Sequence, residues 1–159
     1  MPDRAEIIRA HAIMLAERHK FSVIPIGADK KPAIKWMEYQ DRRPSIEEIL
    51  AWPDAENLAV VTGAVSNLVV VDCDSKEDAQ WFWENISKTS TIAKSRRGYH
   101  YYFRHPGDKV ANGQKINGKY DVRGDGGYAL VPPSRHSEGE YTWCKPLVAV
   151  DELPLFLPE

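Results

Sequence analysis

The pattern of apolar and polar positions along the chain predicts three helices and a larger number of short strands. Apolar residues recur at helical spacing over residues 3–20, where Asp3 is placed to cap the first turn. A second helix begins after Ser45, which has the spacing of a capping box with Glu48. The third helix covers residues 76–86 and follows directly on an apolar strand. The first two helices therefore have defined starting points.

Short apolar runs that end at glycine, proline or charged residues predict the strands. These runs cover residues 21–26, 57–63, 68–74, 91–104 in two pieces, 120–124, 128–133 and 140–144. The segments 27–36 and 106–118 are expected to be loops, because glycine, proline and charge interrupt both periodicities. With mostly antiparallel strands in its second half, the chain is predicted to have an α+β fold.

The strand at residues 68–74 ends in two acids, Asp72 and Asp74, which lie two positions apart and so point to the same face. The strand rise separates their Cα atoms by roughly 6.5–7 Å. From that distance, their carboxylates can converge on divalent metal ions about 3.5–4 Å apart. Oxygen ligands suit Mg²⁺ or Mn²⁺ rather than Zn²⁺. The alternative is that Asp74 caps the next helix and Asp72 only marks a strand end.

A basic and aromatic stretch, SRRGYHYYFRH, follows at residues 95–105. If it is a strand, Arg96, Gly98 and His100 share one face, with the tyrosines next to them on the other. Arginine offers a planar fork of donors to phosphate oxygens, and glycine lets a ligand approach the backbone. This face therefore predicts a polyphosphate site. The stretch matches the RNA-recognition signature only in part, because His100 would obstruct a flat stacking surface.

A third polar strand, YDVRG, carries Asp121 and Arg123 on one face. Asp121 is placed to complete a site of three carboxylates with the two earlier acids. Asp125 lies among glycines and is expected to be a turn residue. His136, in the loop that follows, has no assigned role.

Composition and charge narrow the class of protein. The 159 residues are enough for one domain with a buried core. A net charge of -2 excludes a generally basic nucleic-acid coat, although basic residues cluster near residues 30–43 and 94–104. Cys73 and Cys144 form no CxxC pair and indicate neither a zinc site nor a disulfide framework. This cysteine usage fits a reduced cytoplasmic setting. No apolar segment approaches the roughly 18 residues that span a bilayer, so we expect no membrane.

Four motifs in order, between Phe21 and Trp143, resemble a known family. They are a KKP…W loop, the strand ending in DxD, the GYHYYFR strand and DVRGDGGYALVPPS. The series resembles the bifunctional primase–polymerase domain of phage and plasmid replication proteins, in the archaeo-eukaryotic primase superfamily. The resemblance implies a single domain over residues 1–159, with an antiparallel catalytic core like an RNA-recognition fold at 66–150. A smaller α/β module at 1–65 would pack against it, and residues 151–159 are expected to be an exit or linker segment.

The resemblance also implies an activity and assigns residues to it. Asp72, Asp74 and Asp121 would bind two divalent ions, Mg²⁺ or Mn²⁺, and His100 would contact the triphosphate of the incoming nucleotide. The other nucleotide-binding residues implied are Lys31, Arg96, Arg97, Gly98 and Arg123. The expected reaction is template-directed transfer from ribo- or deoxyribonucleoside triphosphates to a 3′-hydroxyl, which makes and extends primers.

The expected partners are a single-stranded DNA template, a primer and nucleoside triphosphates. A helicase region is expected beyond the C-terminal end in a longer protein, and the isolated domain is expected to be a monomer in the host cytoplasm. Two other functions remain open from the residues alone. A metal-dependent nuclease would use the same three acids, and a non-catalytic module would bind single-stranded nucleic acid without metal. The choice between ribose and deoxyribose and the roles of Lys30, Trp36 and His136 stay open.

Overall fold

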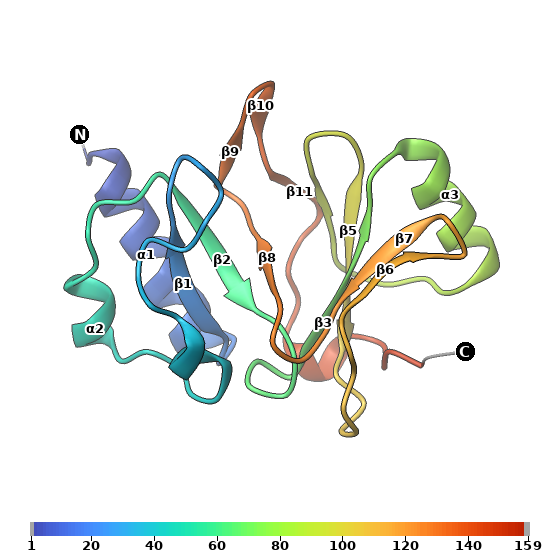
Figure 1. The fold of residues 1–159 in the computed structure, drawn as a ribbon, viewed down its shortest axis with the longest axis horizontal. Helices are drawn as coiled ribbons and strands as arrows, with labels where there is room; N and C mark the ends of the chain where they lie inside the picture. The colour runs from blue at the N-terminus through green and yellow to red at the C-terminus, as the bar shows by residue number, and fades with distance from the viewer. Residues whose placement is uncertain (1, 158–159) are drawn as a thin grey trace.

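Two antiparallel sheets, one of three strands and one of six, stand side by side in the structure (Figure 1). The structure is a computed structural model and describes residues 2–157. The helices are α1 (Arg4–Arg18), α2 (Ile46–Leu50) and α3 (Lys76–Asn85), with 3₁₀ turns η1 (Met37–Gln40) and η2 (Val150–Glu152). In the described part of the chain, no helix has the length and apolar character needed to cross a membrane. The predicted mixed α/β class with antiparallel sheets is confirmed.

The smaller sheet joins β1 (Ser22–Ile26), β2 (Asn57–Val61) and β8 (Tyr128–Leu130), in the order β1-β2-β8. Helix α1 packs on one face of this sheet, and the segment that contains η1 covers the other. Every residue of β1 and β2 is buried, which is why these strands read as continuous apolar runs. Because β8 comes from late in the chain, the boundary expected at residue 65 does not separate the two sheets.

The larger sheet has β3 near its middle, in the order β11-β4-β5-β3-β7-β6. Its strands are β3 (Leu68–Cys73), β4 (Ile92–Lys94), β5 (Tyr99–Arg104), β6 (Gly113–Ile116), β7 (Tyr120–Arg123) and β11 (Thr142–Lys145). Helix α3 covers one face, where Phe82 packs on Tyr101 and Phe103. On the other face, Val70 and Tyr102 belong to the core shared with the smaller sheet. The two faces of β3 therefore alternate as its sequence predicts.

The predicted starts of α1 and α2 are confirmed, and the structure also shows which residue caps α3. Asp3 caps α1, and Ser45 and Glu48 form the capping box of α2. At α3 the cap is Ser75, whose side chain accepts a hydrogen bond from the backbone N–H of Asp78. Asp74 is therefore not the cap, and its carboxylate remains available at the end of β3.

The two strand pieces expected over residues 91–104 are confirmed as β4 and β5, but three short segments differ from the sequence expectations. The segment 106–118 contains β6, a strand with half-exposed and exposed side chains that pairs with β7 at the sheet edge. The stretch 95–98 is a turn, so β5 begins only at Tyr99. A small hairpin, β9 (Arg135–His136) with β10 (Gly139–Glu140), projects beside the gap between the sheets (Figure 1). All three are short polar segments, which hydrophobic periodicity does not reveal.

The C-terminal segment packs against the fold where the sequence predicts a linker. Leu153 is 2% exposed, and the ring of Phe156 contacts that of Phe103. The backbone of Arg104 donates to the carbonyl of Pro154 and accepts from the N–H of Phe156, at 2.8 and 2.9 Å. Leu153 and Phe156 cause this correction, because Leu153 belongs to the core shared by the two sheets and Phe156 packs against the cluster that contains Phe103 of β5. The last part of the expected linker, residues 158–159, lies outside the described residues.

Candidate active site

Three predicted site residues lie in one row across the larger sheet. In the strand register, Asp72 on β3 is directly opposite His100 on β5 and directly opposite Asp121 on β7. Directly opposed residues of antiparallel strands have Cβ atoms roughly 4.5–5.5 Å apart. Strand pairing therefore assembles a histidine and two carboxylates from three separate segments on the face turned away from α3.

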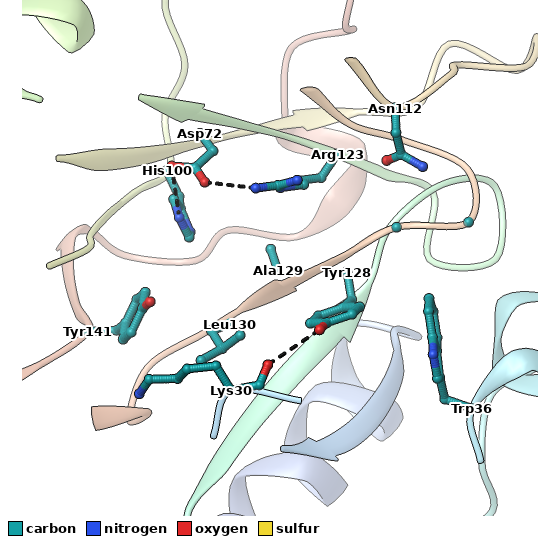
Figure 2. Close-up of a pocket in the computed structure, with 12 residues that line it drawn as sticks. Lys30, Trp36, Asp72, His100, Asn112, Arg123, Tyr128, Ala129, Leu130 and Tyr141 are labelled. Carbon is teal, nitrogen blue, oxygen red and sulfur yellow. Dashed lines mark hydrogen bonds and ion pairs between the residues drawn. The ribbon is translucent and has the colours of Figure 1, made fainter. Parts of the chain in front are cut away.

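Arg123 and His100 hold the central acid of the row. Arg123 Nη2 lies 3.3 Å from Asp72 Oδ2, and His100 Nε2 lies 3.4 Å from Asp72 Oδ1 (Figure 2). Arg123 Nη2 also lies 3.4 Å from Asp121 Oδ2. Burial raises the pKa of the Asp72 carboxyl, but the hydrogen bonds and charges of His100 and Arg123 outweigh it and hold the pKa below its ordinary value. Asp72 is therefore a partly buried carboxylate that stays ionised.

His100 has an unused nitrogen. The residue is 6% exposed, and its Nδ1 atom is buried without a hydrogen-bond partner among the described residues. A buried polar atom without a partner costs free energy, so a ligand that accepts or donates there gains affinity. The ring points into the space between the sheets (Figure 2).

The two arginines and the glycine before His100 lie in the turn from β4 to β5. The expectation that Arg96 and Gly98 share a strand face with His100 is therefore wrong, because the strand has not yet begun. Arg97 Nη2 nevertheless lies 3.4 Å from Asp74 Oδ2, and Arg96 pairs with Glu138 of the β9–β10 hairpin at 2.9 Å. The turn thus brings the Arg97 guanidinium beside the second acid of the DxD motif and ties Arg96 to the hairpin.

Three cavities meet at Asp72, which lines all of them. The largest, about 450 Å³, lies between the two sheets and is lined by three aromatic residues, Trp36, Tyr128 and Tyr141 (Figure 2). We call it the aromatic cavity. Its size falls within the range of small-molecule sites. Trp36 and Tyr128 meet edge to face with ring centroids 5.2 Å apart, so one end of the cavity is a firm apolar wall.

The second cavity, the cationic cavity, has a volume of about 220 Å³. Besides Asp72, Asp74, Ser95 and Tyr141, its lining consists of Lys30, Arg96, Arg97, His100 and His136. Five potential donors around so small a volume match the needs of a polyphosphate. The turn before β5, the loop after β1 and the β9–β10 hairpin each contribute to it.

The third cavity, the acidic cavity, measures about 230 Å³ and contains all three predicted metal ligands. Its lining consists of Asp72, Asp74, Asp78, Asp121, Tyr120, Lys115, Lys119 and Arg123. Carboxylate oxygens are the ligands that Mg²⁺ and Mn²⁺ prefer. Across residues 2–157, no three histidine, cysteine or acidic side chains already stand at metal-binding spacing. The acids fit a divalent ion in kind and location, and the Arg123 guanidinium lies between two of them as a counter-charge.

Cys73, which separates the two acids in the sequence, does not belong to this site. Its side chain lies in the core under α3, on the opposite face from Asp72. Burial, together with the nearby acids, raises the pKa of its thiol to about 12, so the group is neutral. A neutral buried thiol is neither a metal ligand nor a nucleophile.

Asp125 is the turn residue that the sequence predicts. Its carboxylate accepts hydrogen bonds from the backbone N–H groups of Ala64 and Val110, both at 2.8 Å, and contacts His105 Nε2 at 3.0 Å. Burial by itself raises the pKa of the Asp125 carboxyl. The hydrogen bonds from these three partners lower it by more, so the pKa lies below its ordinary value. The turn between β7 and β8 is therefore fixed to two other loops, which positions Arg123 and Tyr128 on either side of it.

Lys30, rather than the predicted Lys31, reaches the site. Lys30 lines the aromatic and cationic cavities, and its ammonium donates to the carbonyl of Arg135. Lys31 is exposed and lines none of the three cavities. Tyr128 and Tyr141 were missed by sequence reasoning, although Tyr128 directly follows the glycine pair of the fourth motif, DVRGDGGYALVPPS. No local signal singles out Tyr141.

Comparison with known proteins gives one match over most of the chain. A family model described as "Bifunctional DNA primase/polymerase, N-terminal" matches residues 12–156. No curated protein matches the chain. The matched range includes the whole row of site residues and nearly all of both sheets.

Proposed function

Because the chain belongs to the family of bifunctional DNA primase/polymerase N-terminal domains, we propose that it transfers nucleotides from nucleoside triphosphates to a 3′-hydroxyl on a DNA template. The convergence of three chemically different cavities at Asp72 carries this proposal. A polymerase must hold a base, a triphosphate and a primer end around one reacting phosphorus. A nuclease acts on DNA without nucleoside triphosphates and needs no triphosphate site beside its acids.

Each cavity takes one part of the reaction. The triphosphate lies in the cationic cavity, where Arg96, Arg97 and Lys30 donate to its oxygens. The base lies in the aromatic cavity against Trp36 and Tyr128, because an aromatic wall stacks on any base. The primer end enters through the acidic cavity, which brings the 3′-hydroxyl to the carboxylate of Asp72.

The chain's own groups stabilise the negative charge that develops. His100 lies at the junction of the cationic and aromatic cavities, and its unpartnered Nδ1 atom is available to the triphosphate. Two divalent ions, Mg²⁺ or Mn²⁺, held by Asp72, Asp74 and Asp121 would activate the hydroxyl and offset the charge of the leaving pyrophosphate. Arg123 pairs with both Asp72 and Asp121 and holds the two carboxylates side by side.

The wider setting of this activity follows from the resemblance of the four sequence motifs. We assign the six-stranded sheet with α3 on one face to the RNA-recognition-like core of such enzymes. The protein then acts in phage or plasmid replication in the cytoplasm of the host, as a monomeric domain joined to a helicase region. Single-stranded template binding is expected to depend strongly on salt, since lysines and arginines contact phosphates.

The activity is tested by incubating the chain with single-stranded DNA, nucleoside triphosphates and Mg²⁺ or Mn²⁺, with and without an annealed primer. We expect an annealed primer to be extended and extension to stop on addition of EDTA, because three acids alone cannot activate the hydroxyl. Products formed without a primer establish priming as well. Metal-dependent shortening of the DNA without nucleotides identifies a nuclease instead. Binding that EDTA does not change, without incorporation, identifies a non-catalytic binding module.

Lys30 and Lys31 form a matched pair for testing where the triphosphate binds. Lys30→Ala is expected to raise the KM for nucleotide about tenfold or more, because a charged hydrogen bond to phosphate is lost. Lys31→Ala is expected to leave KM unchanged, since this side chain is exposed outside the three cavities. Steady-state incorporation on a primed template measures both. An effect confined to Lys31→Ala would contradict this placement of the triphosphate.

A further inference from the structure

Tyr141 lies where the aromatic and cationic cavities join. Four residues line both cavities, and they are Lys30, Asp72, His100 and Tyr141. The other three are charged or polar groups with roles toward phosphate or metal in the proposed reaction. Tyr141 is the one phenol ring of the four, and nothing in that reaction has used it.

The ring of Tyr141 is held from two sides. Its centroid lies 5.8 Å from that of His100 and 5.5 Å from that of His136, with interplanar angles of 50° and 72°. Its backbone N–H donates to the carbonyl of Ser134 at 2.8 Å. The buried hydroxyl of Ser134 is in turn hydrogen-bonded to both the N–H and the carbonyl of Leu58 on β2, at 2.9 Å each. The position of the ring is therefore fixed from the smaller sheet and from both histidines.

We infer that Tyr141 contacts the sugar of the incoming nucleotide and excludes a 2′-hydroxyl, so that the enzyme selects deoxyribonucleotides. This inference rests on the proposed function. In a nucleoside triphosphate the sugar alone connects the base to the phosphates. With the base against Trp36 and the phosphates beside Arg97, the sugar must pass the junction of the two cavities. Figure 2 shows Tyr141 and Trp36 at opposite ends of the aromatic cavity, with His100 above the side of Tyr141.

A fixed aromatic ring beside the sugar discriminates between deoxyribose and ribose, because it occupies the volume that a 2′-hydroxyl would need. The ring cannot move aside without losing its contacts with both histidines, so an added hydroxyl meets an occupied space. Two substitutions separate this effect from hydrogen bonding by the phenol. Tyr141→Phe keeps the ring and removes the hydroxyl, whereas Tyr141→Ala removes the ring and opens the junction.

The test compares kcat/KM for a deoxyribonucleotide and for the matching ribonucleotide on one primed template. We expect the unmodified chain and Tyr141→Phe to prefer the deoxyribonucleotide. In Tyr141→Ala, that preference is expected to fall by on the order of 10- to 100-fold, while deoxyribonucleotide incorporation persists and shows that the variant is folded.

Three other results would overturn the inference. If the unmodified chain incorporates nucleotides but uses ribonucleotides at least as well, Tyr141 is not a barrier to the 2′-hydroxyl. If Tyr141→Ala leaves the preference unchanged, or Tyr141→Phe abolishes it, the ring does not act by volume. In each of these cases the proposed polymerase function stands. An unmodified chain that incorporates neither nucleotide removes the proposed function and this inference together.

Discussion

Replacing Asp72 with asparagine is expected to reduce nucleotide incorporation by about 10³-fold or more while the chain remains folded. Asp72 is the residue common to the three cavities and the centre of the row across β5, β3 and β7. Asparagine keeps the size of the side chain and one acceptor oxygen, so it retains the contact with either Arg123 or His100, which touch different oxygens of Asp72. It removes the negative charge, which both a divalent ion and Arg123 require.

Stability is expected to change far less than activity. The side chain of Asp72 is 22% exposed, and Arg123 retains Asp121 as a second partner. The free energy of unfolding should therefore stay within about 1–3 kcal/mol of the unmodified chain, as for the loss of one charged hydrogen bond. Thermal melting by circular dichroism measures this, and primer extension measures activity.

Asp151→Asn is the matched control, because Asp151 is an exposed acid on η2 outside the three cavities. We expect it to retain full activity. Two outcomes would contradict the site: substantial extension by a folded Asp72→Asn variant, or an equal loss in the Asp151→Asn control. The first would show that the acids of the DxD motif serve only the fold.

The sequence predicts which site residues of one strand share a face of the sheet. It does not predict which strands lie next to each other. A period of two places Asp72 with Val70, and Asp121 with Arg123, and the structure bears out both sets. Nothing in that period says that β7 and β5 flank β3. Those neighbours are decided by packing between distant segments, as is the return of β8 to the smaller sheet. The sequence therefore predicts which side chains share a strand face, but not that Asp121 lies opposite Asp72.

The choice between Lys30 and Lys31 shows a different limit. Lys30 has a φ of +68°, in the left-handed region, and the side chain of Asp29 accepts from the N–H of Lys31 at 3.1 Å. This local turn sets which lysine faces the cavities. Loop residues have no fixed alternation of faces, so the direction of a side chain depends on turn geometry that the spacing of charges does not encode.

Short polar strands are missed because hydrophobic periodicity, which reveals the apolar strands, responds only to buried residues. β6 has the sequence GQKI, lies at a sheet edge and buries none of its residues fully. The β9–β10 hairpin that carries His136 is equally polar. Hydrophobic periodicity reports burial rather than pairing, so an edge strand that buries little gives no signal.

Replacing Gly98 with alanine is expected to cost about 3 kcal/mol or more of stability and to abolish incorporation together with it. A Cβ atom at Gly98 would overlap the carbonyl oxygen of Cys73 and lie 2.7 Å from the backbone nitrogen of Ser75. Both are backbone atoms at the end of β3, between and beside the two acids of the DxD motif. The glycine is needed for this close approach of two chain segments, whereas the sequence suggested that it makes room for a ligand.

The expected loss of activity has its own cause. To admit a Cβ, the turn before β5 must move away from β3, which displaces Asp74 relative to His100. A displacement of about 1 Å in a catalytic array costs roughly 10²-fold in rate. Gly98→Ser carries the same Cβ and is expected to fail in the same way, so the hydroxyl of a serine there offers no compensation.

Gly113→Ala is the matched control for Gly98→Ala. A Cβ at Gly113, on the edge strand β6, would meet the Cδ1 atom of Ile116 at 2.9 Å, and that methyl end can rotate away. We expect this control to melt near the unmodified chain and to extend primers normally. Urea unfolding measures the stability of both variants, and primer extension measures their activity. A Gly98→Ala variant as stable and active as Gly113→Ala would show that β3 and the turn before β5 do not need to touch, and the acids would then be placed by the pairing of β3 with β5 and β7 alone.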